Sequence, residues 1–142
     1  MTLTLDEANR IIEGVLAKAR EMNIKVSVAV CDTGGRLVAF QRMDNAIWAG
    51  VYGSQGKAVA AAGWGRPSGE LTERANRPTQ VGIREAEGNH MIMGQGGMPI
   101  FRNGVLEGAC GVGGGTSQQD EDCARDAIER AGFKTGRADN VS

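Results

Sequence analysis

An Asn-Gly pair at residues 103–104 stands between two apolar runs, PIFR at 99–102 and VLEGACGV at 105–112. Both central residues of a type I′ turn need positive φ, which Asn and Gly adopt most readily. An Asn-Gly pair in this setting is therefore the strongest short-range signal for a β-hairpin. Whatever fold the chain adopts has to contain this antiparallel strand pair.

Three glycines at 113–115 lead from the second strand into a predicted helix. A flexible backbone that ends at a helix N-terminus can approach an anion, because the first amide groups of a helix lack partners. Gly114, Gly115, Thr116 and Ser117 are therefore candidate ligand-binding residues for a carboxylate or a phosphate. The alternative is that Thr116 or Ser117 only caps the helix. There is no GxxxxGK[ST] and no βαβ pattern here, which excludes a P-loop and a Rossmann fingerprint.

The N-terminal part of the chain predicts a helix and a second hairpin. Residues 4–22 begin with a capping box, Thr4-x-x-Glu7, and carry one apolar stripe at helical spacing. Asn23 suits the position just after this helix. Two β-rich runs, 25–32 and 36–42, are joined through Thr-Gly-Gly. Large and small side chains alternate along the first run, which predicts a strand covered on both faces.

Residues 47–63 predict a helix that Asp44 or Asn45 caps, with glycines at 50, 53 and 56 inside it. Each internal glycine costs about 0.5 to 1 kcal/mol relative to alanine, so another backbone or a ligand should lie close to this helix. Lys57 shares its face with small residues. It is either a solvated surface lysine or a cation in a small-walled recess that pairs with an anionic ligand.

The segment 76–89 has no clear periodicity, and we predict a loop with about one helical turn that either is mobile or covers a neighbouring pocket. A short helix at 70–75 precedes it and a short strand at 90–93 follows it. His90 is the only histidine of the chain. A lone histidine on an apolar run is usually a packed, hydrogen-bonded residue, and the alternative is a ligand or a general base.

A final helix at 117–131 ends at Gly132, and we expect residues 133–142 to be frayed.

The length of 142 residues predicts a single domain spanning 1–142, with its core at about 4–131. A net charge of −1 without a basic cluster argues against nucleic-acid binding. Cys31, Cys110 and Cys123 form no CxxC, which argues against a disulfide framework and a zinc site and favours a reducing compartment. No signal-peptide pattern and no bilayer-length apolar stretch are present, so we expect a cytoplasmic protein that binds no membrane.

The motifs together resemble the GlcG/HbpS-like family of haem-degrading and haem-binding-like proteins, also seen as the C-terminal domain of PduO-type proteins. They are VSVAVCDTGGRLVAFQRMDNA, KAVAAAGWGRPSGEL and GQGGMPIFRNGVLEGACGVGGGTSQQDEDCA, in an order that covers roughly residues 4–131. The resemblance implies an α/β (α+β) fold, a single domain with a central antiparallel sheet and flanking helices, similar to profilin or PAS-like domains. It also implies homo-oligomers of paired subunits. Some members of the family bind haem, and others are encoded beside catabolic operons.

Two functions fit this pattern. The first is binding of a small molecule, haem or a carboxylate-bearing metabolite, by Arg42, Lys57 and the helix start at 114–117. Haem iron would then need His90, Met91, Met93 or a residue of a partner subunit as its ligand. The segment 74–90 departs from the family pattern and carries His90, which makes this histidine a candidate axial ligand.

The second function is a cofactor-independent lyase, hydratase or isomerase that acts on a small oxo- or hydroxy-acid. Lys57 and Arg42 would bind a carboxylate or polarise a carbonyl of the substrate, and His90, Asp120 or Asp44 would act as general acid or base. A structural reading is compatible with both functions: Gly50, Gly53 and Ala61 would let the helices of two subunits approach closely.

Overall fold

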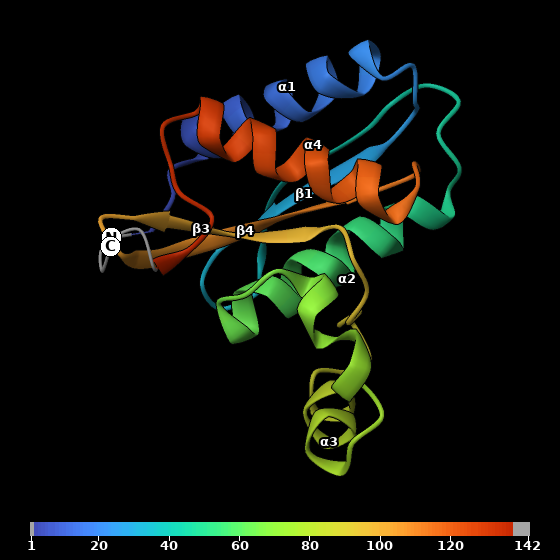
Figure 1. Ribbon diagram of the computed structural model, residues 1–142, viewed down its shortest axis with the longest axis vertical. Helices are drawn as coiled ribbons and strands as arrows, with labels where there is room; N and C mark the ends of the chain where they lie inside the picture. The colour runs from blue at the N-terminus through green and yellow to red at the C-terminus, as the bar shows by residue number, and fades with distance from the viewer. Residues whose placement is uncertain (1, 138–142) are drawn as a thin grey trace.

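The computed structural model describes residues 2–137, which form one α/β domain with a four-stranded sheet between helices (Figure 1). The elements in chain order are α1 (Leu5–Glu21), β1 (Ser27–Cys31), β2 (Leu37–Arg42), α2 (Ala49–Trp64), the 3₁₀ helix η1 (Ser68–Arg74), α3 (Pro78–Ala86), β3 (Gly97–Arg102), β4 (Val105–Gly113) and α4 (Ser117–Arg130).

The sheet has the strand order β2-β1-β4-β3, and every neighbouring pair is antiparallel. The two predicted hairpins are therefore its two halves, joined side by side through β1 and β4. Asn103 and Gly104 have φ values of 51° and 77°, as the predicted turn requires. Helices α1 and α4 cover one face of the sheet and α2 covers the other (Figure 1), which confirms the predicted fold class.

The core lies between the sheet and the helices α1 and α4. The predicted capping box of α1 is present: the Thr4 hydroxyl accepts from the Glu7 amide, and the Glu7 carboxylate accepts from the Thr4 amide. The apolar stripe of α1 is buried, with Ile11 and Ile12 fully enclosed. It packs against α4 and against Val28 and Val30, the large side chains of β1.

Helix α2 lies unusually close to the other face of the sheet because both surfaces are built from small residues. A Cβ atom at Gly111 would overlap with the backbone carbonyl of Ser54, and one at Gly97 would overlap with that of Lys57. The small side chains of β1, β4 and α2 fill the remaining space. The glycines of α2 predicted that another backbone lies close to this helix. For Gly50 that backbone is β4 of the same chain, whereas a Cβ at Gly53 would meet nothing within 4 Å.

The predicted start of α2 was wrong. The helix begins at Ala49, and its N-cap is Trp48 without a side-chain hydrogen bond. Asn45 instead adopts a φ of 67° in the turn before the helix. Asp44 and Asn45 therefore lie too far upstream to cap it.

The segment after α2 differs from the prediction in two ways. Residues 78–86 form the nine-residue helix α3, which begins with Pro78 at its first position, where a proline loses no hydrogen bond. Helix α3 has no buried residue and stands away from the rest of the domain (Figure 1). The predicted strand at 90–93 is absent from this described stretch, because the Ile92 amide bonds to the Gly56 carbonyl of α2 and to no strand.

The C-terminal helix ends as predicted, with Gly132 at a φ of 94°. Residues 133 and 134 are not frayed: Phe133 is buried, and Lys134 exchanges two backbone hydrogen bonds with Phe101 of β3, at 2.8 and 3.0 Å. The last predicted tail residues, 138–142, lie outside the described part of the chain.

Candidate functional site

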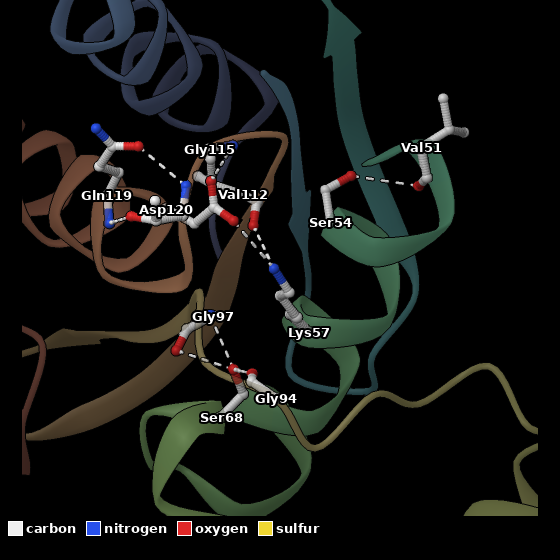
Figure 2. A network of polar contacts seen from close by, with 11 residues as sticks. Val51, Ser54, Lys57, Ser68, Gly94, Gly97, Val112, Gly115, Gln119 and Asp120 are labelled. Atoms are coloured by element: carbon white, nitrogen blue, oxygen red, sulfur yellow. Dashed lines mark hydrogen bonds and ion pairs between the residues drawn. The ribbon is translucent and has the colours of Figure 1, made fainter. Parts of the chain in front are cut away.

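Lys57 of α2 points toward the first turn of α4 (Figure 2). Its Nζ donates a hydrogen bond to the Val112 carbonyl at 3.0 Å and lies 3.3 Å from Oδ2 of Asp120. The side chain of Lys57 is 14% exposed and that of Asp120 is 3% exposed. Lys57 is therefore a nearly buried cation with a carboxylate of its own chain as its partner, and the solvated-lysine reading was wrong.

Asp120 also bonds to the glycine-rich turn before α4. Its Oδ1 accepts a hydrogen bond from the Gly115 amide at 2.8 Å (Figure 2). Burial raises the pKa of Asp120 above its ordinary value, while the charge of Lys57 and the Gly115 amide act in the opposite direction. The ion pair thus joins α2, β4 and the start of α4.

The N-terminal amides of α4 bind side chains of the same turn. The Thr116 hydroxyl accepts from the Gln119 amide at 3.2 Å, and the Gln119 side chain accepts from the Thr116 amide at 2.9 Å. This capping box matches the capping alternative stated for Thr116. A Cβ at Gly114 would overlap with the Lys25 carbonyl, so this glycine lies against the chain's own backbone.

The remaining residues assigned to this site lie apart from it. Ser117 lines an open depression of about 610 Å³, together with Gln95, Glu121 and Arg125. The guanidinium of Arg42, which is exposed, donates to the Ala46 carbonyl at 3.2 and 2.7 Å.

A cavity of about 450 Å³ lies on the other side of α2, a volume typical of small-molecule sites. The β1–β2 hairpin, α2 and the segment after α3 line it together. The lining residues are Ala29, Cys31, Gly35, Arg36, Leu37, Tyr52, Gln55, Gly56, Ala58, Val59, Glu87, Asn89, His90 and Ile92.

His90 lines this cavity, and neither Lys57 nor any residue of 113–120 does. The helical period explains the separation. Gln55, Gly56 and Val59 share one face of α2, and Lys57 projects from the opposite face at about 100° per residue. The structure therefore brings Lys57, Asp120 and Gly115 together and places His90 at a different site.

Arg36 and Tyr52 are cavity residues that the sequence analysis missed. Arg36 follows the Gly-Gly turn of the first hairpin, and Tyr52 is the only tyrosine of the chain. Tyr52 belongs to no motif of recognisable spacing, and its only sequence signal was its rarity. Arg36 lies inside the first family motif, directly after its Gly-Gly turn, but nothing in that motif marks it as a binding residue.

Arg36 and Glu87 form an ion pair between two walls of the cavity, in which Nη1 of Arg36 donates to Oε1 of Glu87. The hydrogen bond from Arg36 lowers the pKa of Glu87, and the same bond raises the pKa of Arg36. Both side chains are therefore charged at neutral pH.

Cys31 forms part of the cavity floor. Burial, and then the charge of Asp32, raises the pKa of this thiol to about 12. The thiol is protonated at neutral pH and contributes an apolar surface.

Within residues 2–137, no helix combines the length and the apolar character that a membrane span requires. In that same range, no three His, Cys, Asp or Glu side chains are grouped so that they could share a metal ion.

The family model described as haem degrading protein HbpS-like matches residues 3–129. An uncharacterized 15.0 kDa protein from the dhaT-dhaS intergenic region of Citrobacter freundii is 33% identical over 129 residues, which are 90% of this chain and 91% of that protein. The crystal structure of Klebsiella pneumoniae protein ORFY has a TM-score of 0.84 and 32% identity, covering 92% of this chain and 91% of that one.

A PduOC:heme complex has the same fold, with a TM-score of 0.85 and 23% identity over 96% of this chain and 99% of that one. The family resemblance in the motifs is thus confirmed by a match to nearly the whole chain: the protein belongs to the HbpS-like family.

Proposed function

We propose that this protein binds haem, or a planar small molecule of similar chemistry, in the cavity between α2 and the β1–β2 hairpin. The observation that carries this proposal is the position of the only histidine of the chain. His90 lines a cavity whose floor is made of small apolar side chains, including Ala29 and Ala58.

The residues that line the cavity fit haem. Haem needs an apolar slot, a ligand for its iron and a cation near its propionates. Val59 and Ile92 supply apolar wall, and the cavity contains one arginine, Arg36. His90 and Tyr52 both line it, and imidazole and phenolate are axial ligands that haem proteins use. Bound haem would supply an iron centre whose properties these side chains tune.

The relatives support the same ligand. The family is described by haem degradation, and a protein with this fold was crystallised as a heme complex. A small carboxylate-bearing metabolite is the other ligand class that the cavity and Arg36 would suit.

A lyase, hydratase or isomerase is supported less well. Such an enzyme would need Lys57 and an acid-base group, such as His90 or Asp120, on either side of one substrate. Lys57 and Asp120 instead bond to each other, and His90 lines a cavity that neither of them reaches. We therefore place ligand binding before catalysis.

Self-association and a cytoplasmic location complete the proposal. Ile47, Trp48 and Tyr52 expose more than three-fifths of their surface around the start of α2, an apolar group that a second copy of the chain could cover. Light scattering after size exclusion tests this idea, and a monomeric mass contradicts it.

Three free, buried cysteines support a reducing compartment, and a role beside catabolic enzymes can be checked in the neighbouring genes.

The test of haem binding is a titration of the purified protein with haemin. We expect a saturable shift of the Soret band that His90→Ala abolishes or strongly weakens. Met91 is buried in an apolar cluster and does not line the cavity, so Met91→Leu should leave the shift intact. Absence of a saturable shift in the unaltered protein would rule out the proposal, and a shift unaffected by His90→Ala would rule out His90 as the iron ligand.

A further inference from the structure

The Arg36–Glu87 ion pair connects two parts of the chain that are 51 residues apart in sequence and that both line the cavity. Among the described residues that line this cavity, Arg36 is the only permanent cation and Glu87 is the only carboxylate. The guanidinium that a ligand's carboxylate would bind therefore already binds a carboxylate of the protein.

The two partners are held with different rigidity. The carboxylate of Asp32 accepts hydrogen bonds from the backbone amides of Gly34 and Arg36, at 2.9 and 3.0 Å, which fixes the turn that carries Arg36. The Asp32 amide also donates to the Arg36 carbonyl at 2.9 Å. Arg36 thus stands on a well-bonded turn of the sheet.

Glu87 stands at the end of a helix that buries none of its residues. It directly follows α3, which has no buried residue and stands away from the sheet (Figure 1). Two hydrogen bonds hold the chain in place after Glu87, where it returns to the domain. The Thr72 hydroxyl donates to the Met93 carbonyl, and the Ile92 amide donates to the Gly56 carbonyl, each at 3.0 Å. Gly88 and Asn89, with φ of 70° and 62°, form a tight turn between Glu87 and the residues held by these hydrogen bonds.

This asymmetry determines which partner moves when the pair opens. An exposed ion pair contributes little to stability, and 68% of the Arg36 side chain is exposed. A second carboxylate can therefore replace Glu87 at low cost. Arg36 would keep its place on the bonded turn, and α3 would lose its side-chain link to the hairpin.

We propose that Arg36 is the carboxylate-recognition residue of the cavity, and that Glu87 occupies it until a carboxylate-bearing ligand displaces Glu87 and releases α3. This inference rests on the proposed ligand binding in the same cavity. It assigns the cavity a preference for anionic ligands and couples binding to the motion of one helix.

The experiment compares haemin, which carries two carboxylates, with haemin dimethyl ester, which carries none, in the same dilute detergent. In the unaltered protein haemin should bind more tightly than the ester. Arg36→Gln should weaken haemin by about fivefold, the upper range for an exposed charge pair, and leave the ester unchanged. Arg36→Lys should restore part of the preference for haemin over the ester. Glu87→Gln should strengthen the binding of haemin and leave the binding of the ester unchanged.

Arg130→Gln is the matched control, because Arg130 forms an ion pair with Asp126 at nearly the same exposure, 67% and 28%, on α4 away from the cavity. Hydrogen exchange supplies an independent readout: amides of 78–86 should exchange faster in Glu87→Gln, and in the unaltered protein once haemin is added. If both compounds bind and Arg36→Gln does not change their ratio, the inference is overturned while ligand binding stands. If neither compound binds, the proposed function fails and the inference fails with it.

Discussion

Nζ of Lys57 and Oδ2 of Asp120 lie 3.3 Å apart at the end of β4, where the helices on the two faces of the sheet come within reach of each other (Figure 2). Lys57 belongs to α2 and Asp120 to α4, so the pair links the two helical layers. The sequence offered both residues as groups that act on a ligand. In the folded chain each is the other's counter-ion.

Replacing Lys57 by Met should destabilise the protein by about 3 kcal/mol, because Asp120 would become a buried carboxylate without its cation. Urea denaturation measures this loss. Lys25→Met, at an exposed lysine, is the control and should change little. Asp120→Asn added to Lys57→Met should recover part of the loss, and a stable Lys57→Met protein would contradict the role of this pair.

Acid should weaken the fold through Glu7. The hydrogen bonds from Arg102, which donates to both carboxylate oxygens at 2.9 Å, are the main reason that the pKa of Glu7 falls from 4.5 to about 2. A lowered pKa in the folded state means that this contribution is complete above about pH 4.5 and disappears as the pH falls toward 2.

Melting curves between pH 6 and pH 2 test this sign. The stability difference between the unaltered protein and Glu7→Gln should shrink as the pH falls through that window. A difference that stays constant, or grows with acid, would show that Glu7 has no such role.

Gly111→Ala should be strongly destabilising, because the new Cβ would overlap with the Ser54 carbonyl and push α2 off the sheet. We expect a loss of about 1 to 3 kcal/mol or more, as for other overpacked cores. Gly82→Ala on α3 is the control: a Cβ there meets nothing within 4 Å, and alanine in a helix is favoured by about 0.5 to 1 kcal/mol. Equal stability of the two variants would contradict the close packing of α2.

The parts of the fold that were predicted correctly depend on short-range signals. The capping box of α1, the Asn103–Gly104 turn and the helix end at Gly132 each involve residues within about four positions of one another. Such signals survive in the folded protein because the hydrogen bonds or φ angles they describe are local.

The site could not be predicted in the same way, because its contacts are long-range. Asp120 is 63 residues from Lys57, and Glu87 is 51 residues from Arg36. The face of α2 that carries Lys57 was identified correctly, but only the fold shows that an acidic side chain of the same chain fills the space next to it. Gly96 lies next to the same pair. A Cβ there would lie 2.8 Å from Nζ of Lys57, so this position needs a glycine, but its place in a glycine-rich run did not reveal that need.

The central claim, that the ligand site is the His90 cavity, is tested most directly by amide NMR spectra of the ¹⁵N-labelled protein during titration with zinc protoporphyrin, a diamagnetic analogue of haem. Ring-current shifts should concentrate at residues 35–37, 52–59 and 87–92, which line or border the cavity. Shifts concentrated at 112–120, around the Lys57–Asp120 pair, would contradict the account and return the ligand to the N-terminus of α4.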